Sequence, residues 1–525
     1  MGKELVIVHY HLRPGGVRRV IELGTAGIAS KMGCDCVRIV AGEAPPDEWF
    51  EVLKSKLKGL KFNQFIRPSF GYISEQGCSI GELKKTITRD AQELFNELKK
   101  EAVIWFHNPA VGRNIFLTNE FFRQSTEHGI PLIAHHHDWW FENRWQRLDE
   151  MFKCGFDSLE KIADVFFNAS PNIKHCAINY CDYSILQKYF QDNSAWFPNP
   201  LELENLPDKS RIKTARMWLE EELNDENDVW LMPCRVLRRK NIAEAILIKE
   251  WINPEAWLAT TAGTSSADEI GYANAISIFC KERKIKFKPG IVANDLNKNP
   301  PDVYSLIAAS DVVLLTSLQE GFGLSYIEAG LMKTPLIARM LVNLEEDFQK
   351  FGLKFPHKYK DILIHPDLFS WREESQRQRQ IYESWVARLP LEFQRRAKLP
   401  EIVKAPYSPE PIPFSKLTLQ AQLEVLSHPA PYSFEKCAGL NPSIGKMKKR
   451  TETGRLKPVE FLSFTVEALS LGKYSENFLK ITNAKPKHVL DKQILMRVQN
   501  EFIRKKLSSE FIYPLLIEKS WNNEL

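Results

Sequence analysis

Residues 310–341 constrain the fold more than any other part of the chain. They read SDVVLLTSLQEGFGLSYIEAGLMKTPLIARML. The apolar run 312–315 predicts a buried strand, and the pattern after Gly323 predicts a helix. Between them, Gly321 and Gly323 let the backbone approach a ligand closely, and the first helical turn offers unpaired N–H groups to an anion. The segment therefore predicts a strand, an anion-binding glycine loop and a helix.

Two carboxylates flank this loop. Glu320 precedes the helix and Glu328 lies inside it, so they do not share a helical face, and we predict that they hold different parts of one elongated ligand. The motif, EGFG followed by EA, resembles that of the retaining GT-B glycosyltransferases of family four. The resemblance implies that Glu320 contacts the donor sugar and Glu328 the ribose. It also implies that the loop backbone binds phosphate and sugar, through Gly321, Phe322, Gly323 and Leu324.

The amino-terminal segment predicts another unit of this kind. Residues 3–10 form an apolar strand pattern, Gly15 and Gly16 form a loop, and a helical pattern follows as far as Gly33. This resembles the glycine-rich loop of the same family, which implies that the Gly15–Gly16 backbone lies near the donor diphosphate and the acceptor. The alternative is a plain turn.

Histidines follow two later strand patterns. The run 103–106 leads into His107, and the run 130–134 leads into three histidines, of which His137 is the last. Residues just past the carboxyl ends of parallel strands line the ligand crevice of an open α/β sheet. Only alternate side chains of a strand share a face, and zinc would require further ligands, so we predict no metal site.

The dipeptide His137-Asp138 resembles a pair that the same family carries after a strand, which implies that His137 approaches the donor sugar. The next residues, WWFENRW, combine aromatic faces with the hydrogen-bonding groups of Glu142, Asn143 and Arg144, as suits a sugar ring. We therefore predict an acceptor site, made by His107, Asp138 and Trp139. The alternative is an aromatic segment that packs into the core.

A basic loop follows the strand pattern at residue 229. Arg235 and Lys240 stand five residues apart, as in the resembled family, where this pair neutralises the departing nucleotide in place of a metal. The chain differs from the family pattern because Cys234 and Asn241 replace its two glycines. Arg238 and Arg239 therefore compete as phosphate ligands, and a solvated basic surface is the structural alternative.

The alternation of strand and helix patterns predicts an α/β fold with an α-rich C-terminal extension, and the resemblance implies the GT-B type, with two facing Rossmann-like domains. Its 525 residues exceed what one core holds. We expect an acceptor domain at 1–200, a nucleotide-sugar domain at 201–399, a proline-rich linker at 400–413 and a basic helical extension at 414–525. We also expect a strand at 162–169 and a helix at 371–389 that returns to the first domain.

The composition bears on the cellular location and on the classes of binding partner. No run of eighteen apolar residues and no secretory signal pattern is present, and nine cysteines without a CxxC pair favour reduced thiols in the cytoplasm. The net charge of +5 does not indicate nucleic acid, although it permits peripheral contact with an anionic membrane.

The resemblance implies a retaining hexosyltransferase that uses a nucleotide-sugar and needs no other cofactor. The histidine- and tryptophan-rich segments favour a small soluble acceptor. The residues expected to carry the chemistry are Glu320, Arg235, Lys240 and His137. A glycosidase would instead place two carboxylates across one bond. The remaining alternatives are a membrane-associated transferase of lipid or polysaccharide glycan synthesis, and a non-catalytic scaffold that binds sugar nucleotides.

Overall fold

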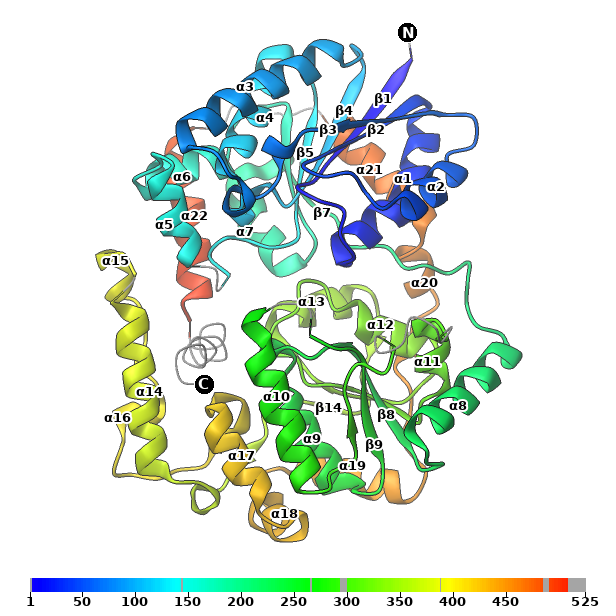
Figure 1. The fold of residues 1–525 in the computed structure, drawn as a ribbon, viewed down its shortest axis with the longest axis vertical. Coiled ribbons are helices and arrows are strands. Elements are labelled where there is room, and N and C mark those ends of the chain that lie inside the picture. Colours follow the sequence, from blue (N-terminus) through cyan, green and yellow to red (C-terminus); the bar gives the residue numbers. More distant parts are fainter. Residues whose placement is uncertain are drawn as a thin grey trace. The chain divides into compact units, whose positions relative to one another are not determined.

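The structure is a computed structural model that describes residues 2–142, 145–264, 267–292, 300–387, 389–484 and 491–508. The chain divides into two compact units. The first comprises Met1–Glu202 and Phe464–Lys506, and the second is built mainly from Leu203–Ser463. Each unit contains a parallel sheet flanked by helices (Figure 1), which confirms the predicted α/β class with two Rossmann-like units.

The described part of the first unit has a seven-stranded sheet in the order β3-β2-β1-β4-β5-β6-β7, with every neighbouring pair parallel. The central strands are buried on both faces, which explains their continuous apolar sequences. The strands are β1 Lys3–Val8, β2 Cys34–Ala41, β3 Lys61–Ile66, β4 Ala102–His107, β5 Leu132–His136, β6 Ile173–Ala177 and β7 Ser194–Trp196.

Local sequence signals set the helix ends of this unit. Gly33 takes the left-handed conformation that ends α1, and Ser79 and Glu82 form a capping box at the start of α3. The helices are α1 Gly16–Met32, α2 Asp47–Lys56, α3 Ile80–Glu97, α4 Ile115–His128, α5 Gln146–Lys153, α6 Leu159–Phe166, α7 Tyr180–Phe190, α20 Thr465–Ala468, α21 Leu471–Asn483 and α22 Gln493–Lys506.

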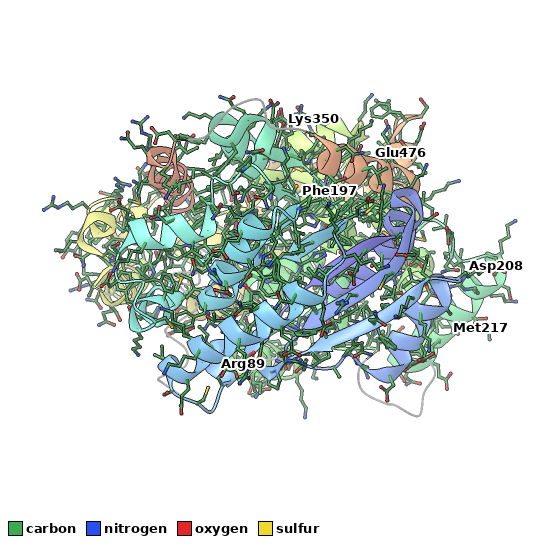
Figure 2. All side chains as sticks on the ribbon, turned by 90° about the horizontal axis from the view of Figure 1, so that it is seen from above. Arg89, Phe197, Asp208, Met217, Lys350 and Glu476 are labelled. Carbon is green, nitrogen blue, oxygen red and sulfur yellow. The ribbon has the colours of Figure 1, made fainter. Side chains whose placement is uncertain are left out.

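The C-terminal helices complete the core of the first unit. Helix α21, orange in Figure 1, lies beside α1. Tyr474 of α21 stacks on Phe197, which Figure 2 labels, with ring centroids 4.2 Å apart. A Cβ atom on Gly24 of α1 would lie 2.7 Å from the Tyr474 ring and 3.1 Å from Trp105. The glycine therefore allows the close approach of the two helices.

We expect Gly24→Ala to lower the free energy of unfolding by about 1–3 kcal/mol, because the buried Tyr474 and Trp105 rings have no room to move. This would outweigh the helix-propensity gain of about 1 kcal/mol. Urea unfolding measures the change. Gly81→Ala is the matched control, because a Cβ there meets nothing within 4 Å. Equal stabilisation by both substitutions would contradict the packing argument.

The described part of the second unit has a six-stranded parallel sheet in the order β10-β9-β8-β11-β12-β14. Two short antiparallel pairs, β13 with β17 and β15 with β16, accompany it. The strands are β8 Val229–Arg235, β9 Trp257–Ala262, β10 Phe287–Lys288, β11 Val312–Leu315, β12 Leu336–Arg339, β13 Leu353–Lys354, β14 Lys358–Tyr359, β15 Leu363–Ile364, β16 Ile412–Pro413 and β17 Glu460–Phe461.

Helices of the second unit alternate with its strands and then continue as a helical run. They are α8 Lys209–Leu223, α9 Ile242–Ile252, α10 Ala267–Glu282, α11 Val303–Ala309, α12 Leu324–Leu331, α13 Val342–Lys350, α14 Trp371–Val386, α15 Leu391–Gln394, α16 Glu401–Lys404, α17 Leu419–Ser427, α18 Ala430–Ala438 and α19 Pro442–Glu452. No helix within the described residues is long and apolar enough to cross a membrane.

The region expected as one extension divides between the units. Residues up to Ser463 belong to the second unit, where the indole of Trp251 donates to Ser433 Oγ at 2.9 Å. Phe464–Lys506 belongs to the first unit. The prediction that a helix at 371–389 returns to the first domain is wrong, because helix α14 belongs to the second unit. The segment that returns to the first unit is residues 464–506, and its aromatic and aliphatic side chains are buried in that unit.

The strand expected at 162–169 is wrong. Helix α6 occupies Leu159–Phe166, and Ser158 caps it by accepting a hydrogen bond from the Lys161 N–H. The next strand, β6, begins at Ile173. The apolar residues at 162, 163, 165 and 166 cover one helical face, a spacing that a short window does not distinguish from a buried strand.

Candidate functional site

The glycine loop of the second unit has the predicted form. It connects β11 to α12, and Gly323 at the helix start takes a left-handed conformation with φ of 76°. A Cβ there would lie 2.8 Å from Leu344, so only glycine fits. No described side chain caps α12, so the N–H groups of Leu324 and Ser325 meet no capping side chain, whereas the Tyr326 N–H donates to the Gly323 carbonyl at 3.0 Å. Phe322 is buried, while Gly321, Leu324 and Glu328 are partly exposed.

Glu320 pairs with basic side chains at this loop. The Lys240 ammonium contacts its carboxylate, and Arg239 Nη1 lies 3.9 Å from the other carboxylate oxygen. Burial raises the pKa of Glu320, but the charges of Lys240 and Arg239 outweigh it, and the pKa falls below the ordinary value. Two cations therefore face one ionised carboxylate, which leaves net positive charge to attract a phosphate.

The basic loop is fastened to the glycine-loop side of the sheet. Thr316 Oγ1 donates to the Lys240 carbonyl at 2.8 Å, and the Leu318 N–H donates to the Arg239 carbonyl at 2.8 Å. Asn241 adopts the left-handed conformation, with φ of 55° and ψ of 51°. Asparagine tolerates this conformation better than most residues. The replacement of the family's glycine at this position is therefore compatible with the loop.

The structure separates the competing basic residues. Arg238 is 2% exposed and donates to the Leu417 carbonyl at 3.1 Å, so its guanidinium forms a structural contact in the core and is not a phosphate ligand. Arg235 is exposed at the end of β8. Arg239 joins Lys240 beside Glu320, a role that the sequence left open. Burial raises the pKa of the Cys234 thiol to about 11, so this residue is neutral near pH 7.

A buried ion pair supports both loops. Arg339 of β12 binds Glu244 of α9, with Nη2 and Oε2 2.5 Å apart. Asn241 Nδ2 donates to the same carboxylate at 2.9 Å, and the Tyr326 hydroxyl of α12 donates to the Arg339 carbonyl at 2.8 Å. The pair thus links the basic loop to the glycine-loop helix. It was not predicted from the sequence, although Glu244 stands alone within the apolar run 242–248.

Histidines gather at the carboxyl ends of the strands in the first unit. His9 follows β1, His107 ends β4, and His137 follows β5. His107 is 0% exposed and His137 is 8% exposed, and His107 Nδ1 lies 3.0 Å from His137 Nε2. Burial lowers the pKa of His107 and of His137 well below the ordinary value, so both rings are neutral at pH 7. His9 was not predicted from the sequence as a member of this cluster.

Asp138 lies beside this cluster and is partly exposed. The Asn108 side-chain carbonyl accepts hydrogen bonds from the backbone N–H groups of His137, at 2.7 Å, and of Asp138, at 2.9 Å. Both residues are therefore held at a fixed strand end. His107 was expected to bind the acceptor, but its complete burial behind this strand end leaves no surface for that contact.

The expected stacking of a sugar on Trp139 is wrong. Trp139 is 1% exposed, its ring lies 4.2 Å from that of His136 and 4.6 Å from that of Phe502, and its indole donates to Asp182. Glu142 pairs with the buried Lys506 ammonium. The aromatic segment therefore packs into the core. Asn143 and Arg144 lie outside the described residues.

Gly15 and Gly16 form an exposed entry to helix α1. Gly15 has extended backbone, and a Cβ on Gly16 would meet nothing within 4 Å. Packing therefore does not require glycine at either position. No described side chain caps the helix, so its first N–H groups are open to a ligand.

Comparison with known proteins identifies two informative relatives. The chain is 26% identical over 439 residues to mannosylglucosyl-3-phosphoglycerate synthase of Petrotoga mobilis, which covers 80% of this chain and 79% of the relative. It is 24% identical over 374 residues to mannosylglucosylglycerate synthase of Thermotoga maritima, which covers 67% of this chain and 84% of the relative. These relatives support a glycosyltransferase. No protein-family model matches the chain.

Among solved structures, the chain is similar to sucrose-phosphate synthase from Thermosynechococcus elongatus, with a TM-score of 0.46 and 12% identity. The alignment covers 96% of this chain and 99% of that chain.

The three histidines His107, His135 and His137 do not fit a metal ion. His107, His135 and His137 bring nitrogen atoms within 4.8 Å of one another. However, the Trp105 indole, which can only donate, contacts His135 Nδ1 at 3.2 Å. His135 Nε2 therefore carries the proton and donates to the Phe197 carbonyl at 3.1 Å. With both His135 nitrogens occupied, two histidines remain, fewer than the three protein ligands of a typical zinc site.

Proposed function

We propose that the chain transfers a hexose from a nucleotide-sugar to a small soluble carbohydrate acceptor with retention of anomeric configuration. The observation that carries the proposal is the Lys240–Arg239–Glu320 cluster beside the uncapped start of α12. It combines a cationic surface for a diphosphate with a carboxylate for sugar hydroxyls. The relatives are synthases of glycosides by name, which agrees with this chemistry.

The donor would bind the second unit. Lys240, Arg239 and Arg235 would stabilise the charge that develops on the departing nucleoside diphosphate, because electrostatic stabilisation of a leaving group lowers the transfer barrier. Glu320 would bind the sugar and Glu328 the ribose. In this proposal neither a metal nor another cofactor takes part. Within the first unit, His137 and Asp138 would offer hydrogen bonds to a sugar hydroxyl.

The acceptor class follows from the names of the relatives. They point to mannosyl transfer onto glucosylglycerate or glucosyl-3-phosphoglycerate, and we carry this over as part of the proposal. A cytoplasmic location and a peripheral contact with an anionic membrane remain expectations from the sequence.

The test is an assay with GDP-mannose and UDP-glucose as donors and with glucosylglycerate and glucosyl-3-phosphoglycerate as acceptors. We expect one donor–acceptor pair to give a product with two sugar residues on the glycerate group, and NMR should show that the transferred sugar keeps the anomeric configuration of the donor. The rate should be unchanged in EDTA. The matching nucleoside diphosphate at about 100 times its Kd should stabilise the protein by about 2.7 kcal/mol. Nucleotide binding without transfer to any acceptor would support the scaffold alternative instead.

A further inference from the structure

A hydrogen bond joins His107 and His137 in the first unit, with 3.0 Å between His107 Nδ1 and His137 Nε2. Both rings are neutral, so one nitrogen of this pair carries the proton and the other accepts it. The direction of the bond decides which nitrogen of His137 remains protonated. It therefore decides whether His137 offers an N–H or a lone pair to a ligand.

The buried side of His107 distinguishes the two directions. Its Nε2 is buried and has no hydrogen-bond partner among the described residues. If His137 donated, this Nε2 would carry an unpartnered N–H, whereas if His107 donates it holds only an unpartnered lone pair. Orphaned buried N–H groups are rarer than under-satisfied acceptors in folded proteins. The nearby Trp105 ring offers at best a weak N–H···π contact.

A second buried histidine pair of the same unit provides an internal comparison. His175 Nε2 lies 2.9 Å from the Asn168 carbonyl, which can only accept, so His175 Nδ1 is unprotonated. It accepts from His136 Nε2 at 3.1 Å. The remaining nitrogen, His136 Nδ1, is buried without a partner in the described part of the chain. In that pair too, the nitrogen without a partner, His136 Nδ1, is unprotonated and carries a lone pair, not an N–H.

We propose that His107 is a positioning residue that donates from Nδ1 to His137 Nε2 and so holds His137 in the Nδ1–H tautomer. His137 Nδ1 has no hydrogen-bond partner within the residues that the structure describes. The ring thus presents a fixed N–H, which binds an oxygen of a neutral or anionic ligand and does not act as a general base. The link to transfer rests on the proposed function, but the assignment of the tautomer does not.

The backbone around the pair supports this fixed orientation. His9 Nδ1 donates to the His107 carbonyl at 3.2 Å, and Asn108 Oδ1 accepts from the His137 N–H at 2.7 Å. The His107 and His137 ring planes lie 24° apart with centroids 5.3 Å apart. Hydrogen bonds to the backbone of each residue, together with the bond between the two rings, therefore fix the positions of both imidazoles.

The first experiment is 15N–1H correlation NMR on the full chain labelled with 15N-histidine, with the His137 signals assigned by their loss in His137→Gln. We expect the chemical shifts of a protonated Nδ1 and an unprotonated Nε2 for His137. The opposite pattern would overturn the proposal, whether or not the protein transfers sugar. This measurement therefore separates the failure of the inference from the failure of the proposed function.

The second experiment compares His107→Asn with His107→Phe. The asparagine amide can place an N–H near the position of Nδ1, whereas phenylalanine keeps the ring volume without a donor. We expect His107→Phe to lower kcat at least about tenfold and His107→Asn to recover most of it. His175→Phe, which breaks the other buried pair, is the control for lost stability and should keep kcat within about twofold. Equal kcat in folded His107→Phe and wild type would overturn the proposal.

Discussion

Lys240→Ala should lower kcat by about 100- to 1,000-fold, the scale seen when one preorganised group that stabilises transition-state charge is removed. The substitution takes away the cation that contacts Glu320 and leaves that largely buried carboxylate with Arg239, whose Nη1 lies 3.9 Å away, as its cationic partner. Steady-state transfer kinetics with saturating donor and acceptor measure the effect. Because the loss belongs to the leaving-group step, the Kd of the nucleoside diphosphate should change less than kcat.

Lys436→Ala is the matched control for this substitution. Lys436 belongs to the same unit, is 37% exposed, and forms a surface pair with Asp367 at 3.3 Å. Exposed pairs of this kind contribute little, so kcat and stability should remain close to the wild-type values. A folded Lys240→Ala protein that transfers sugar at the wild-type rate would contradict the assignment of the basic loop.

The sequence predicted the second unit well because its main signals are local. The strand before Glu320, the glycine at the left-handed position and the helix after it depend on neighbouring residues, and Gly323 occupies the position where only glycine fits. The proximity of Lys240 and Glu320 could also have been predicted from the sequence, since each residue follows a predicted strand end. Parallel strands bring such ends to one edge of a sheet.

The sequence was less informative where packing decides the outcome. Trp139 and His107 stand next to strand ends, as site residues do, but the side chains of Phe502 and His136 cover Trp139. Phe502 lies far along the chain, and no local pattern predicts that contact. The division of the C-terminal region between two units likewise depends on tertiary burial, as at Tyr474, and not on the composition of the segment.

Arg339→Met should lower the stability of the second unit by about 3–5 kcal/mol, the cost typical of breaking a buried ion pair on one side. Glu244 is 0% exposed, so its carboxylate would remain buried with the Tyr359 hydroxyl and the Asn241 amide as donors but no arginine. The loss is measured by unfolding in urea, with the unfolding of the second unit monitored by its cleavage by a protease. A change below about 1 kcal/mol would show that the pair contributes little.

The double substitution Arg339→Met with Glu244→Leu separates stability from site geometry. Replacing both charges with apolar side chains removes the uncompensated carboxylate, so most of the lost stability should return. It does not restore the hydrogen bond from Asn241 Nδ2 to Glu244, which holds the residue after Lys240 in its left-handed conformation. The repaired protein should therefore fold well and still bind the nucleoside diphosphate more weakly. If donor affinity recovered together with stability, the ion pair would be a packing element alone, and the remaining contacts of Lys240 with Thr316 would suffice to hold the basic loop.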